Sequence, residues 1–538
     1  MLPVLLPSRM QEADRRTIEA GVPSVVLMER AGHAVAFSAL QLLGGAYGRR
    51  ILVLAGKGNN GGDALVVARK LHRMGALVRI AMTQPPRSLE GDPRVMYERL
   101  VPLGIPVGTP APEIIEKVAG NSDLVIDGLF GTGFKGAASG IVGEWIEAAN
   151  RSGTAILAID IPSGLDGATG SVRGPVIKAV KTVALQALKC GHLLGEGPKV
   201  CGDLEIADLG IAVADADATA FVSEAADIAD MVPRRPVDAH KWSSGSVLVV
   251  GGSRGMTGAA IMTAKAALKA GAGIVMLAIP RSVQHHVVPT VPELLTLALE
   301  ETSEGALSED AFEAIAAAAS RYRILAVGPG LGREPSTGRL VRRLLGELDN
   351  PAVVDADALN LLGADAYKVV GERETPTVIT PHPAEMARML ASDPKVVDRE
   401  RLWVATEVAA KWQCVVILKG HRSVVAGPDG IPVVNVTGGP ELATAGTGDV
   451  LTGIVAALLS AGASPTGAAI AGAWLHGQAG RLAGDSTRGH GVTAPAVIEH
   501  VPEALALLGD HADNGGDGVA TGLATESSQV LGPIRRLS

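Results

Sequence analysis

A glycine-rich segment in the C-terminal half of the chain contains residues that could transfer a phosphoryl group. In TAGTGDVLTG (444–453), small residues lead into Asp449 at the start of an apolar helix. Backbone N–H groups of such a loop can bind phosphoryl oxygens, and an aspartate at the helix start can take a proton from a hydroxyl group. Asp449 could instead only cap the helix, but a cap does not also require Gly446 and Gly448. We therefore interpret Asp449 as a catalytic residue.

Three glycine-rich loops in the N-terminal half could bind a ligand at one edge of a sheet. They are AGKGNNGGD (55–63), DGLFGTGFKG (127–136) and IDIPSGLDG (159–167). Because the carboxyl ends of strands in a doubly wound sheet converge on one crevice, these loops could surround a single ligand. The first loop could bind a phosphate through its N–H groups, or its glycines could only form a tight turn. Asp127 and Asp160 could help to coordinate a cation, or could cap the next helix.

The elements that must position these loops follow a β/α rhythm from Ile51 to about Gly210. The predicted strands are ILVLAG (51–56), LVIDG (124–128), AILAID (155–160) and KTVAL (181–185), and DALVVARKLHRMG (63–75) is the first predicted helix. This half therefore predicts an α/β fold with a Rossmann-like, doubly wound parallel sheet.

A second β/α series follows a change of composition. The stretch AVADADATAFVSEAADIADMVPRRP (212–236) has weak strand periodicity and several acids, so we place a domain boundary there. The later predicted strands lie in SVLVVGG, IVMLAIP, ILAVGPGLG, AVVDADAL, TVITPHP and CVVILKG, and the last residues are polar without a hydrophobic period. We predict an N-terminal domain over 1–212, a linker over 213–236, a C-terminal α/β domain over 237–509 and a disordered tail over 510–538.

The composition of the chain excludes several classes of protein. With 538 residues the chain is too long for one ordinary core, so two large domains are expected. Apolar residues make up 47% and aromatic residues only 3%, which favours tight α/β layers. The formal net charge of -8, without a stripe of Lys or Arg, argues against a nucleic-acid partner.

The cysteines and the apolar segments indicate where the protein resides. Cys190, Cys201 and Cys414 form no C-x-x-C pair and no disulfide framework, which suits a reducing compartment, and the N-terminus lacks signal-peptide features. We therefore expect a cytoplasmic protein. The uncharged segment 450–475 is long enough to span a membrane, but Pro465 and Thr466 predict a break between two packed helices. No membrane partner is expected.

The N-terminal motifs resemble the YjeF N-terminal domain, the NAD(P)H-hydrate epimerase family. The resemblance rests on the three loops, on LMERAG (27–32) and on ALKCGHLLGEGPKVCGDLEIADLGI (187–211), and it spans nearly all of 8–212. This chain departs from the family pattern at Arg30, where the family usually has asparagine, and at Ala64, where it often has glycine.

The resemblance implies roles for individual residues. It implies hydrate contacts at Asn59, Asn60, Gly61, Gly62, Asp63, Gly131, Thr132, Gly133, Phe134, Lys135, Gly136, Ala137 and Asp160. It also implies that Asp160 is the acid/base and that Asn60, Asp127 and Ser163 hold a potassium ion. Inverting the hydrated carbon requires losing and regaining the hydroxyl group, or opening the ring, beside a general acid/base.

The C-terminal loop resembles that of the ribokinase-like superfamily, whose members phosphorylate small alcohols without a Walker A motif. Further segments resemble the ADP-dependent NAD(P)H-hydrate dehydratase over 238–508. They are KWSSGSVLVVGGSRGMTGAAIMTAKAALKAGAG (241–273), GPGLG (328–332), DADALN (355–360), TPHPAE (380–385) and LKGHRSVVA (418–426). This half is therefore expected to have a ribokinase-like α/β fold.

This second resemblance also implies residue roles. Nucleotide contacts are implied for Lys419, Gly420, His421, Arg422, Ser423 and Gly448, and hydrate contacts for Ala259, Gly330, His382 and Asp449. ADP would be the co-substrate, and Glu385 would help to position Mg²⁺. Lys419 could instead be a solvated strand end, and a histidine between prolines, such as His382, is more often a loop or packing residue.

Together the resemblances imply repair of hydrated NADH and NADPH. The R and S hydrates would be interconverted, and the S form would be dehydrated with ADP, releasing AMP and phosphate. The partners expected are these small molecules, with the chain forming a homo-oligomer. One alternative is a ribokinase-like small-molecule kinase fused to a non-catalytic Rossmann-like domain. Another is a binding module, because YjeF-like folds also occur in scaffolds of RNA metabolism, but here Asn60, Asp127, Asp160 and Ser163 are all present.

Overall fold

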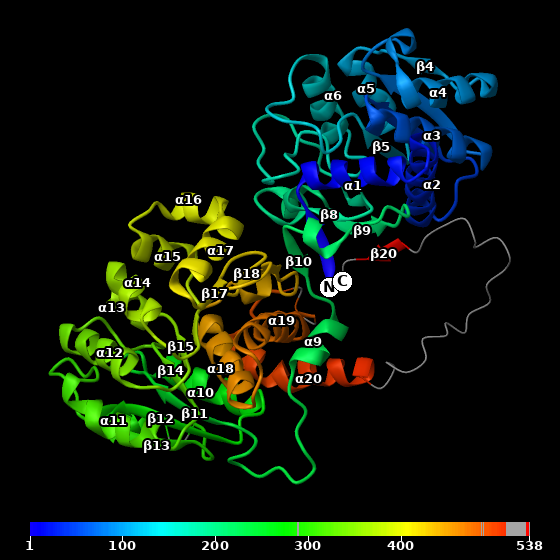
Figure 1. Cartoon of the computed structure of the whole chain (residues 1–538). Coiled ribbons are helices and arrows are strands. Elements are labelled where there is room, and N and C mark those ends of the chain that lie inside the picture. The colour runs from blue at the N-terminus through cyan, green and yellow to red at the C-terminus, as the bar shows by residue number, and fades with distance from the viewer. Residues whose placement is uncertain (288–289, 486, 488, 513–533, 537–538) are drawn as a thin grey trace. The chain divides into compact units, whose positions relative to one another are not determined.

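The computed structural model describes residues 1–287, 290–485, 487, 489–512 and 534–536, and it divides into two compact units (Figure 1). The N-terminal unit contains Leu2–Ala220 together with residues 534–536, and the C-terminal unit begins at Phe221. Both units have the α/β architecture that the sequence predicts.

The N-terminal unit alternates strands and helices along most of its length. Its strands are β1 (Leu2–Leu5), β2 (Arg50–Ala55), β3 (Leu77–Met82), β4 (Val107–Gly108), β5 (Leu124–Gly128), β6 (Ile156–Ile159), β7 (Lys181–Leu185), β8 (Leu188–Lys189), β9 (Asp203–Ala207) and β20 (Ile534–Arg536). Its α-helices are α1 (Pro7–Glu19), α2 (Ser24–Leu43), α3 (Asn59–Arg73), α4 (Gly91–Leu100), α5 (Pro112–Gly120), α6 (Gly140–Arg151), α7 (Cys190–Leu193) and α8 (Gly197–Val200).

The sheet of this unit has the strand order β20-β9-β7-β6-β5-β2-β3-β4. Every neighbouring pair is parallel except β20 with β9, and β1 pairs separately with β8. The strand order reverses between β2 and β5, so the segments that follow these two strands run to opposite faces of the sheet. A reversal of this kind opens a crevice at the carboxyl ends of the strands.

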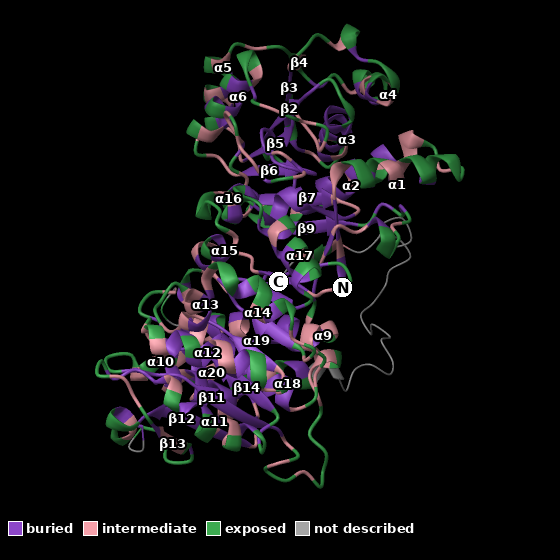
Figure 2. Cartoon of the chain, turned by 60° about the vertical axis from the view of Figure 1, so that its left-hand side comes forward, coloured by how far each residue is buried: buried purple, intermediate pink, exposed green. Residues whose placement is uncertain are grey.

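Strand β2 shows why both faces of the sheet are covered. Its side chains alternate, with Ile51 and Val53 in the core shared with α2, α3 and α4. Leu52 and Leu54 lie in a second core, which contains Trp145 of α6. From Ile51 to Ala55 this strand is apolar and buried on both faces, so helices must pack on both sides of the sheet. The predicted doubly wound sheet is therefore confirmed, and its central strands are mostly buried (Figure 2).

The C-terminal unit is built in the same way around a longer sheet. Its strands are β10 (Ala220–Val222), β11 (Ser246–Val250), β12 (Ile274–Pro280), β13 (Leu295–Leu299), β14 (Ile324–Val327), β15 (Ala352–Val354), β16 (Thr377–Ile379), β17 (Val415–Leu418), β18 (Val424–Ala426) and β19 (Val433–Val434). Its α-helices are α9 (Ala225–Met231), α10 (Thr257–Lys269), α11 (Phe312–Ala319), α12 (Pro335–Glu347), α13 (Asp357–Leu362), α14 (Ala366–Gly371), α15 (Pro383–Leu390), α16 (Pro394–Arg399), α17 (Arg401–Trp412), α18 (Thr447–Ser460), α19 (Pro465–Gly484) and α20 (Ala494–Ala512).

In this sheet the order is β13-β12-β11-β14-β15-β16-β17-β18-β19-β10. The strands are parallel from β13 to β17, and β18 is antiparallel to both of its neighbours. Val247 and Val249 of β11 pack in a core with α10, α18, α19 and α20. Helix α18 approaches α10 closely because Gly453 has no side chain, and a Cβ there would lie 2.2 Å from the Thr263 carbonyl oxygen.

The uncharged segment 450–475 forms parts of two helices. Helix α18 ends at Ser460 and α19 begins at Pro465, with the Ser464 hydroxyl accepting a hydrogen bond from the Gly467 N–H at 3.1 Å. The predicted break is confirmed. In the ranges that the structure describes, we find no helix whose length and apolar character would let it cross a bilayer.

Two segments differ from the sequence-based expectation. The predicted linker 213–236 contains β10 and α9, and Ile228 of α9 is buried in the core of the C-terminal unit. The predicted disordered tail is wrong at its described positions, because α20 continues to Ala512 and residues 534–536 form β20. Residues 513–533 and 537–538 of that predicted tail lie outside the described residues.

Candidate active sites

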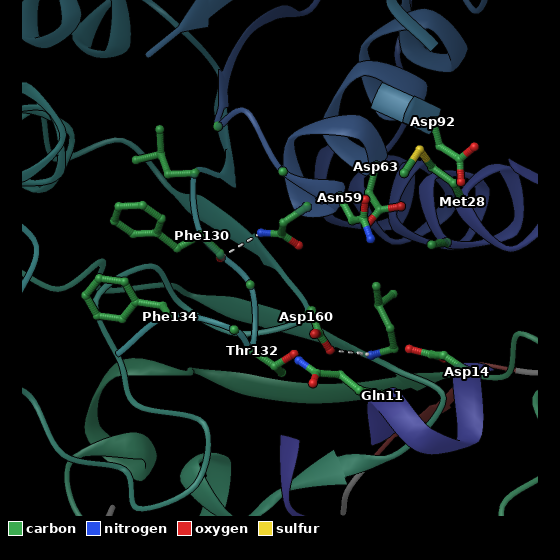
Figure 3. Close-up of a pocket in the computed structure, with 18 of the residues that line it drawn as sticks. Gln11, Asp14, Met28, Asn59, Asp63, Asp92, Phe130, Thr132, Phe134 and Asp160 are labelled. Atoms are coloured by element: carbon green, nitrogen blue, oxygen red, sulfur yellow. Dashed lines mark hydrogen bonds between the residues drawn. The ribbon is translucent and has the colours of Figure 1, made fainter. Parts of the chain in front are cut away.

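A cavity of about 790 Å³ lies at the carboxyl ends of the strands in the N-terminal unit (Figure 3). Its walls come from the segments that directly follow β2, β3, β5 and β6, and from α1 and α2. The predicted loops therefore meet at one cavity, and its position is the one that the reversal of strand order dictates.

Most of the predicted hydrate contacts line this cavity. Those in its wall are Asn59, Asn60, Asp63, Gly131, Thr132, Gly133, Phe134, Lys135 and Asp160, whereas Gly61, Gly62, Gly136 and Ala137 are not in the wall. Gly61 and Gly62 are needed for packing instead. A Cβ at Gly61 would lie 2.0 Å from the Gly56 carbonyl oxygen, and one at Gly62 would lie 2.6 Å from the Met28 sulfur. Helix α3 begins at Asn59 rather than at the predicted residue 63, so Asn59 and Asn60 form its first turn.

Asp160 directly follows β6 and has a left-handed backbone conformation, with a φ of 63°. Its carboxylate accepts hydrogen bonds from the Lys189 ammonium at 2.5 Å and from the Leu185 N–H at 3.1 Å. Lys189 is buried and also donates to the Leu185 carbonyl oxygen at 2.8 Å. This buried ion pair holds the Asp160 carboxyl group in place in the cavity wall.

A buried histidine fixes the backbone of Asp160. The Lys189 N–H donates to His192 Nδ1 at 3.0 Å, so the ring proton is on Nε2, which donates to the Asp160 carbonyl oxygen at 2.7 Å. Burial and the charge of Lys189 lower the pKa of His192 to about 4, so the ring is neutral. Sequence reasoning selected neither Lys189 nor His192, although both lie in the motif 187–211.

The predicted ion ligands meet around the backbone of Phe130. The Ser163 hydroxyl donates to Asp127 Oδ1 at 2.6 Å, and the Ser163 N–H donates to Asp127 Oδ2 at 2.8 Å. Asn60 Nδ2 donates to the Phe130 carbonyl oxygen at 2.7 Å, and the Phe130 N–H donates to the Ser163 hydroxyl at 2.8 Å. Three loops that are far apart in the sequence thus form one polar network.

This network has the chemistry of a cation site. It contains carboxylate, hydroxyl and main-chain carbonyl oxygens, which hard cations prefer. Asp127 is fully buried, and burial raises its pKa to about 6 despite the hydrogen bonds from Ser163. A positive ion beside it would favour the ionised carboxylate. The residues present therefore fit a bound cation.

Asp449 lies in the first turn of α18, at the helix start that the glycine-rich segment 444–453 predicts. Burial and the nearby Asp355 raise the pKa of Asp449 to about 7, although Lys419 opposes the shift. A carboxyl group that titrates near neutral pH can both accept and release a proton. The N–H groups of the first turn of α18 have no partners within the helix, so they can face phosphoryl oxygens.

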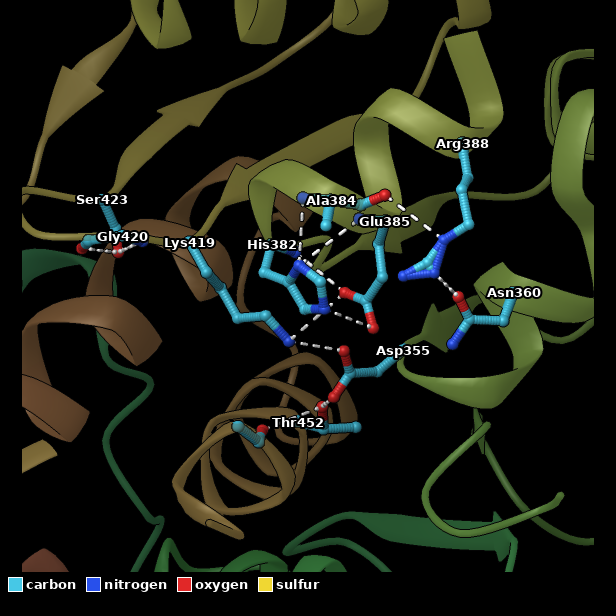
Figure 4. A network of polar contacts seen from close by, with 11 residues as sticks. Asp355, Asn360, His382, Ala384, Glu385, Arg388, Lys419, Gly420, Ser423 and Thr452 are labelled. Carbon is cyan, nitrogen blue, oxygen red and sulfur yellow. Dashed lines mark hydrogen bonds and ion pairs between the residues drawn. The ribbon is translucent and has the colours of Figure 1, made fainter. Parts of the chain in front are cut away.

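Lys419 lies among carboxylates at the carboxyl ends of the central strands (Figure 4). Its Nζ atom is 2.8 Å from Asp355 Oδ1 and 4.0 Å from Glu385 Oε2. Asp355 is buried and also accepts a hydrogen bond from the Thr452 hydroxyl at 2.7 Å. Burial opposes both charges, but the pair lowers the pKa of Asp355 and raises that of Lys419. Lys419 is thus an anchored cation and not a solvated strand end.

His382 is held as the N-cap of α15. Its Nδ1 atom accepts hydrogen bonds from the N–H groups of Ala384 at 3.1 Å and Glu385 at 3.3 Å. The His382 N–H in turn donates to Glu385 Oε2 at 2.8 Å. Burial and the charge of Lys419 lower the pKa of His382, so the neutral ring acts as an acceptor. The alternative raised from the sequence is a loop or packing residue, and the structure shows a helix cap; the hydrate contact of His382 stays a prediction.

Other predicted contacts approach one another in the C-terminal unit. A Cβ at Gly448 would lie 3.3 Å from Lys419 Nζ, so the ammonium group lies against the start of α18. A Cβ at Gly330 would lie 3.2 Å from the Cβ of Ala259, so these two predicted hydrate contacts are neighbours.

The loop between β17 and β18 contains the remaining predicted nucleotide contacts. Arg401 donates to the carbonyl oxygens of His421 at 2.6 Å and Arg422 at 3.4 Å. The Ser423 hydroxyl donates to the Gly420 carbonyl oxygen at 3.1 Å. These bonds fix the backbone of the loop beside Lys419.

Comparisons with known proteins match both halves of the chain. Family models match residues 24–191 as a YjeF-related protein N-terminus and residues 247–503 as NAD(P)H-hydrate dehydratase. The bifunctional NAD(P)H-hydrate repair enzyme Nnr of Moorella thermoacetica is 42% identical over 510 residues, 93% of this chain and 96% of that protein. The protein of the same name in Thermofilum pendens is 38% identical over 505 residues, with coverages of 93% and 96%.

Solved structures cover the C-terminal half of the chain. One of them is the ADP/ATP-dependent NAD(P)H-hydrate dehydratase of Bacillus subtilis, co-crystallised with ATP and Mg²⁺. It is 30% identical to this chain, covers 54% of this chain and 99% of its own, and superposes with a TM-score of 0.48.

Proposed function

Because the chain belongs to the family of bifunctional NAD(P)H-hydrate repair enzymes, we propose that its two units repair hydrated NADH and NADPH. The N-terminal unit interconverts the R and S hydrates. The C-terminal unit dehydrates the S form with ADP, which gives NAD(P)H, AMP and phosphate. The observation that carries this proposal is a reactive carboxylate in each unit, Asp160 in the cavity wall and Asp449 in the first turn of α18.

In the N-terminal unit, Asp160 is the group that takes the proton. The hydrate carries its hydroxyl group on a ring carbon, and inversion of that carbon needs proton transfer at the hydroxyl oxygen. The Asp160 carboxyl group is held by its contact with Lys189, and its backbone is fixed by His192, so the group is fixed in one position. A preorganised base of this kind loses little entropy on reaching the reactive geometry.

We infer that Asn60, Asp127 and Ser163, with the Phe130 carbonyl group, hold a potassium ion. A bound cation would supply positive charge between the loops after β5 and β6 and so hold them around the hydrate. The support for this inference is the shared oxygen network and the buried carboxyl group of Asp127.

Potassium is expected to stabilise the N-terminal unit through Asp127. We expect K⁺, compared with Na⁺ at equal ionic strength, to raise the unfolding temperature of this unit, because binding to the folded state alone favours folding. The variant Asp127→Asn should lose this K⁺-dependent shift, since the amide removes the negative charge. Differential scanning calorimetry measures the unfolding temperatures of the wild type and of the variant in each salt. An equal K⁺-dependent shift in the variant would exclude Asp127 as a ligand, and dehydration of S hydrate serves as the control for the other unit.

In the C-terminal unit, Asp449 accepts the hydroxyl proton of the S hydrate as its oxygen attacks the terminal phosphorus of ADP and AMP leaves. Lys419 and the N–H groups in the first turn of α18 neutralise charge on the transferring phosphoryl group. Phosphate then leaves the ring carbon more readily than hydroxide would, and loss of a proton from the adjacent carbon restores the dihydropyridine.

Magnesium fits this site as a companion of the nucleotide. Mg²⁺ commonly uses one or two carboxylates together with substrate phosphates, and Glu385 supplies a carboxylate near Lys419. Across the described residues, no group of three or more His, Cys, Asp or Glu side chains could hold a metal by itself. The ion would therefore arrive with the nucleotide and supply charge neutralisation on the phosphates.

The complete function is tested by following recovery of the reduced ring. Purified protein is mixed with R and S hydrates, K⁺, Mg²⁺ and either ADP or ATP, and absorbance of the dihydropyridine is recorded. Complete recovery is expected, because epimerisation feeds the R form into dehydration. Recovery of only the S fraction would exclude the epimerase step. Accumulation of a stable phosphorylated product would instead indicate the ribokinase-like kinase.

We also place the enzyme in the reducing cytoplasm. Cys190, Cys201 and Cys414 are free and buried. Burial raises the pKa of each thiol to about 12, so these residues serve as small core side chains.

A further inference from the structure

Asp14 lies in the wall of the N-terminal cavity, although it precedes the segment that the family model matches, 24–191. It belongs to α1, whose buried face contains Met10, Ala13 and Thr17. Figure 3 shows the Asp14 carboxyl group pointing toward Asp160 across the cavity wall. Helix α1 therefore brings a second carboxyl group to the acid/base of the proposed epimerase.

Asp14 is surrounded by charged groups from several elements. Lys189, at the end of β8, favours its ionised form, whereas Asp160 after β6 opposes it. Asp63 in the first turns of α3 also interacts with both Asp14 and Asp160. Burial is the largest influence and raises the pKa of Asp14 to about 6. Burial also raises the pKa of Asp63, so both Asp14 and Asp63 hold a proton more readily than an ordinary carboxyl group, whereas Lys189 contacts Asp160 directly.

Epimerisation needs one group that donates a proton and another group that accepts one. If the hydroxyl group leaves, one group must protonate the departing oxygen, and another must take a proton from the water that adds to the opposite face. If the ring opens, one group must take the hydroxyl proton while another protonates the ring nitrogen. In the ring-opening route one carboxyl group cannot donate and accept at two atoms at once. In the water-loss route a carboxyl group on one face of the ring does not reach the water that adds to the opposite face, so Asp160 alone does not complete either route.

We propose that Asp14 is a second catalytic residue of the epimerase, which donates a proton to the hydrate while Asp160 accepts one. This proposal rests on the proposed function of the N-terminal unit. It assigns the two carboxyl groups complementary tasks, which exchange when the reaction runs in the opposite direction.

The steps balance in atoms and charge for the route through loss of water. The Asp14 carboxyl group gives its proton to the hydroxyl oxygen as the carbon–oxygen bond breaks, and the ring-nitrogen lone pair forms a carbon–nitrogen double bond. Water then adds to the opposite face, the π electrons return to nitrogen, and the excess proton goes to Asp160. One proton has moved from Asp14 to Asp160, and proton exchange with solvent resets the pair.

The test compares Asp14→Asn with the full-length wild type and with Glu12→Gln, a control on the same helix. Glu12 is outside the cavity wall and pairs with Arg15 at 2.6 Å. Initial rates of conversion of R hydrate to S hydrate are measured by chromatography in K⁺ without ADP. We expect Asp14→Asn to lower kcat by about 10²-fold or more with little change in KM, because a general acid typically contributes that factor. Glu12→Gln should match the wild type.

The pH profile supplies a readout that a purely structural role would not move. In the wild type, kcat/KM should fall as pH rises above about 6 and Asp14 loses its proton. Asp14→Asn should lack this decline, and Asp14→Glu should recover part of the rate and the decline. Calorimetry of the N-terminal unit checks folding, which the neutral amide should preserve because burial already disfavours the charged carboxylate.

Several outcomes would overturn the proposal. An unchanged kcat in Asp14→Asn, or a rise in KM alone, would show that Asp14 only lines the cavity and does not transfer a proton. If Asp63→Asn abolishes the decline above pH 6 while Asp14→Asn keeps it, Asp63 is the acid instead. Absence of R-to-S conversion in the wild type is a different result, because it would reject the proposed epimerase function itself.

Discussion

Replacing Asp449 with asparagine is expected to lower ADP-dependent dehydration of the S hydrate by about 10² to 10⁴-fold, the usual contribution of a general base. The amide keeps the size of the side chain but cannot accept the hydroxyl proton. Both phosphate release and recovery of absorbance by the reduced ring should be lost, while binding of ADP, measured by calorimetry, should persist. The ion pair between Lys419 and Asp355 does not involve the substituted side chain.

The same chain supplies the control, because Asp449→Asn should leave R-to-S conversion in the N-terminal unit unchanged. Since burial raises the pKa of Asp449 to about 7, the ionised side chain destabilises the folded state at higher pH. The variant should therefore unfold at the same temperature or higher at pH 8. In the wild type, kcat/KM should fall about tenfold per unit of pH below 7, as the base becomes protonated. Wild-type turnover by the variant would remove Asp449 from the mechanism.

Replacing Asp160 with asparagine is expected to abolish epimerisation, with a loss of about 10²-fold or more in the R-to-S rate. Asparagine is the suitable substitute because, unlike most residues, it tolerates the left-handed backbone that Asp160 adopts at a φ of 63°. Chromatography of the two hydrates measures the rate, and the S hydrate should still be dehydrated in the other unit.

Stability is the complication in this variant, because the buried Lys189 ammonium loses its charged partner. Breaking a buried ion pair in this way costs about 3–5 kcal/mol. The double variant Asp160→Asn with Lys189→Met removes both charges and should unfold at a higher temperature than the single variant. It should remain inactive. If R-to-S conversion returns together with stability, Asp160 holds the fold and does not transfer protons.

Much of the fold could be predicted from the sequence because its strands are short and mainly apolar runs. Runs such as 124–128 and 181–185 coincide with β5 and β7, and this pattern is typical of strands buried on both faces. The helix break before Pro465 was predictable from the proline and the small polar residues around it. The region 213–236 was misread because α9 is short and acidic, and its burial depends mainly on Ile228 meeting helices far away in the sequence.

The candidate sites were only partly predictable for a similar reason. Residues in glycine-rich loops, such as Asp160 and Asp449, were found because loop chemistry is visible locally. Lys189 and Asp355 were missed, although both lie inside quoted motifs, because a lysine or an aspartate at a strand end is usually solvated. Only the tertiary structure shows that each forms a buried ion pair. Asp14 lies on a helix with no motif, and only the cavity connects it with Asp160.

The short strand β20 affects how well the N-terminal unit can be produced as a separate fragment. Strand β20 pairs with β9 through Ile534, Arg535 and Arg536, so it covers the outer margin of the N-terminal sheet. A fragment that stops at Ala220 would leave the amides and carbonyls along that margin without partners. Such an open margin invites self-association with other extended segments. If an isolated N-terminal unit is insoluble, the cause would then be the unpaired edge of β9 and not a failure to fold.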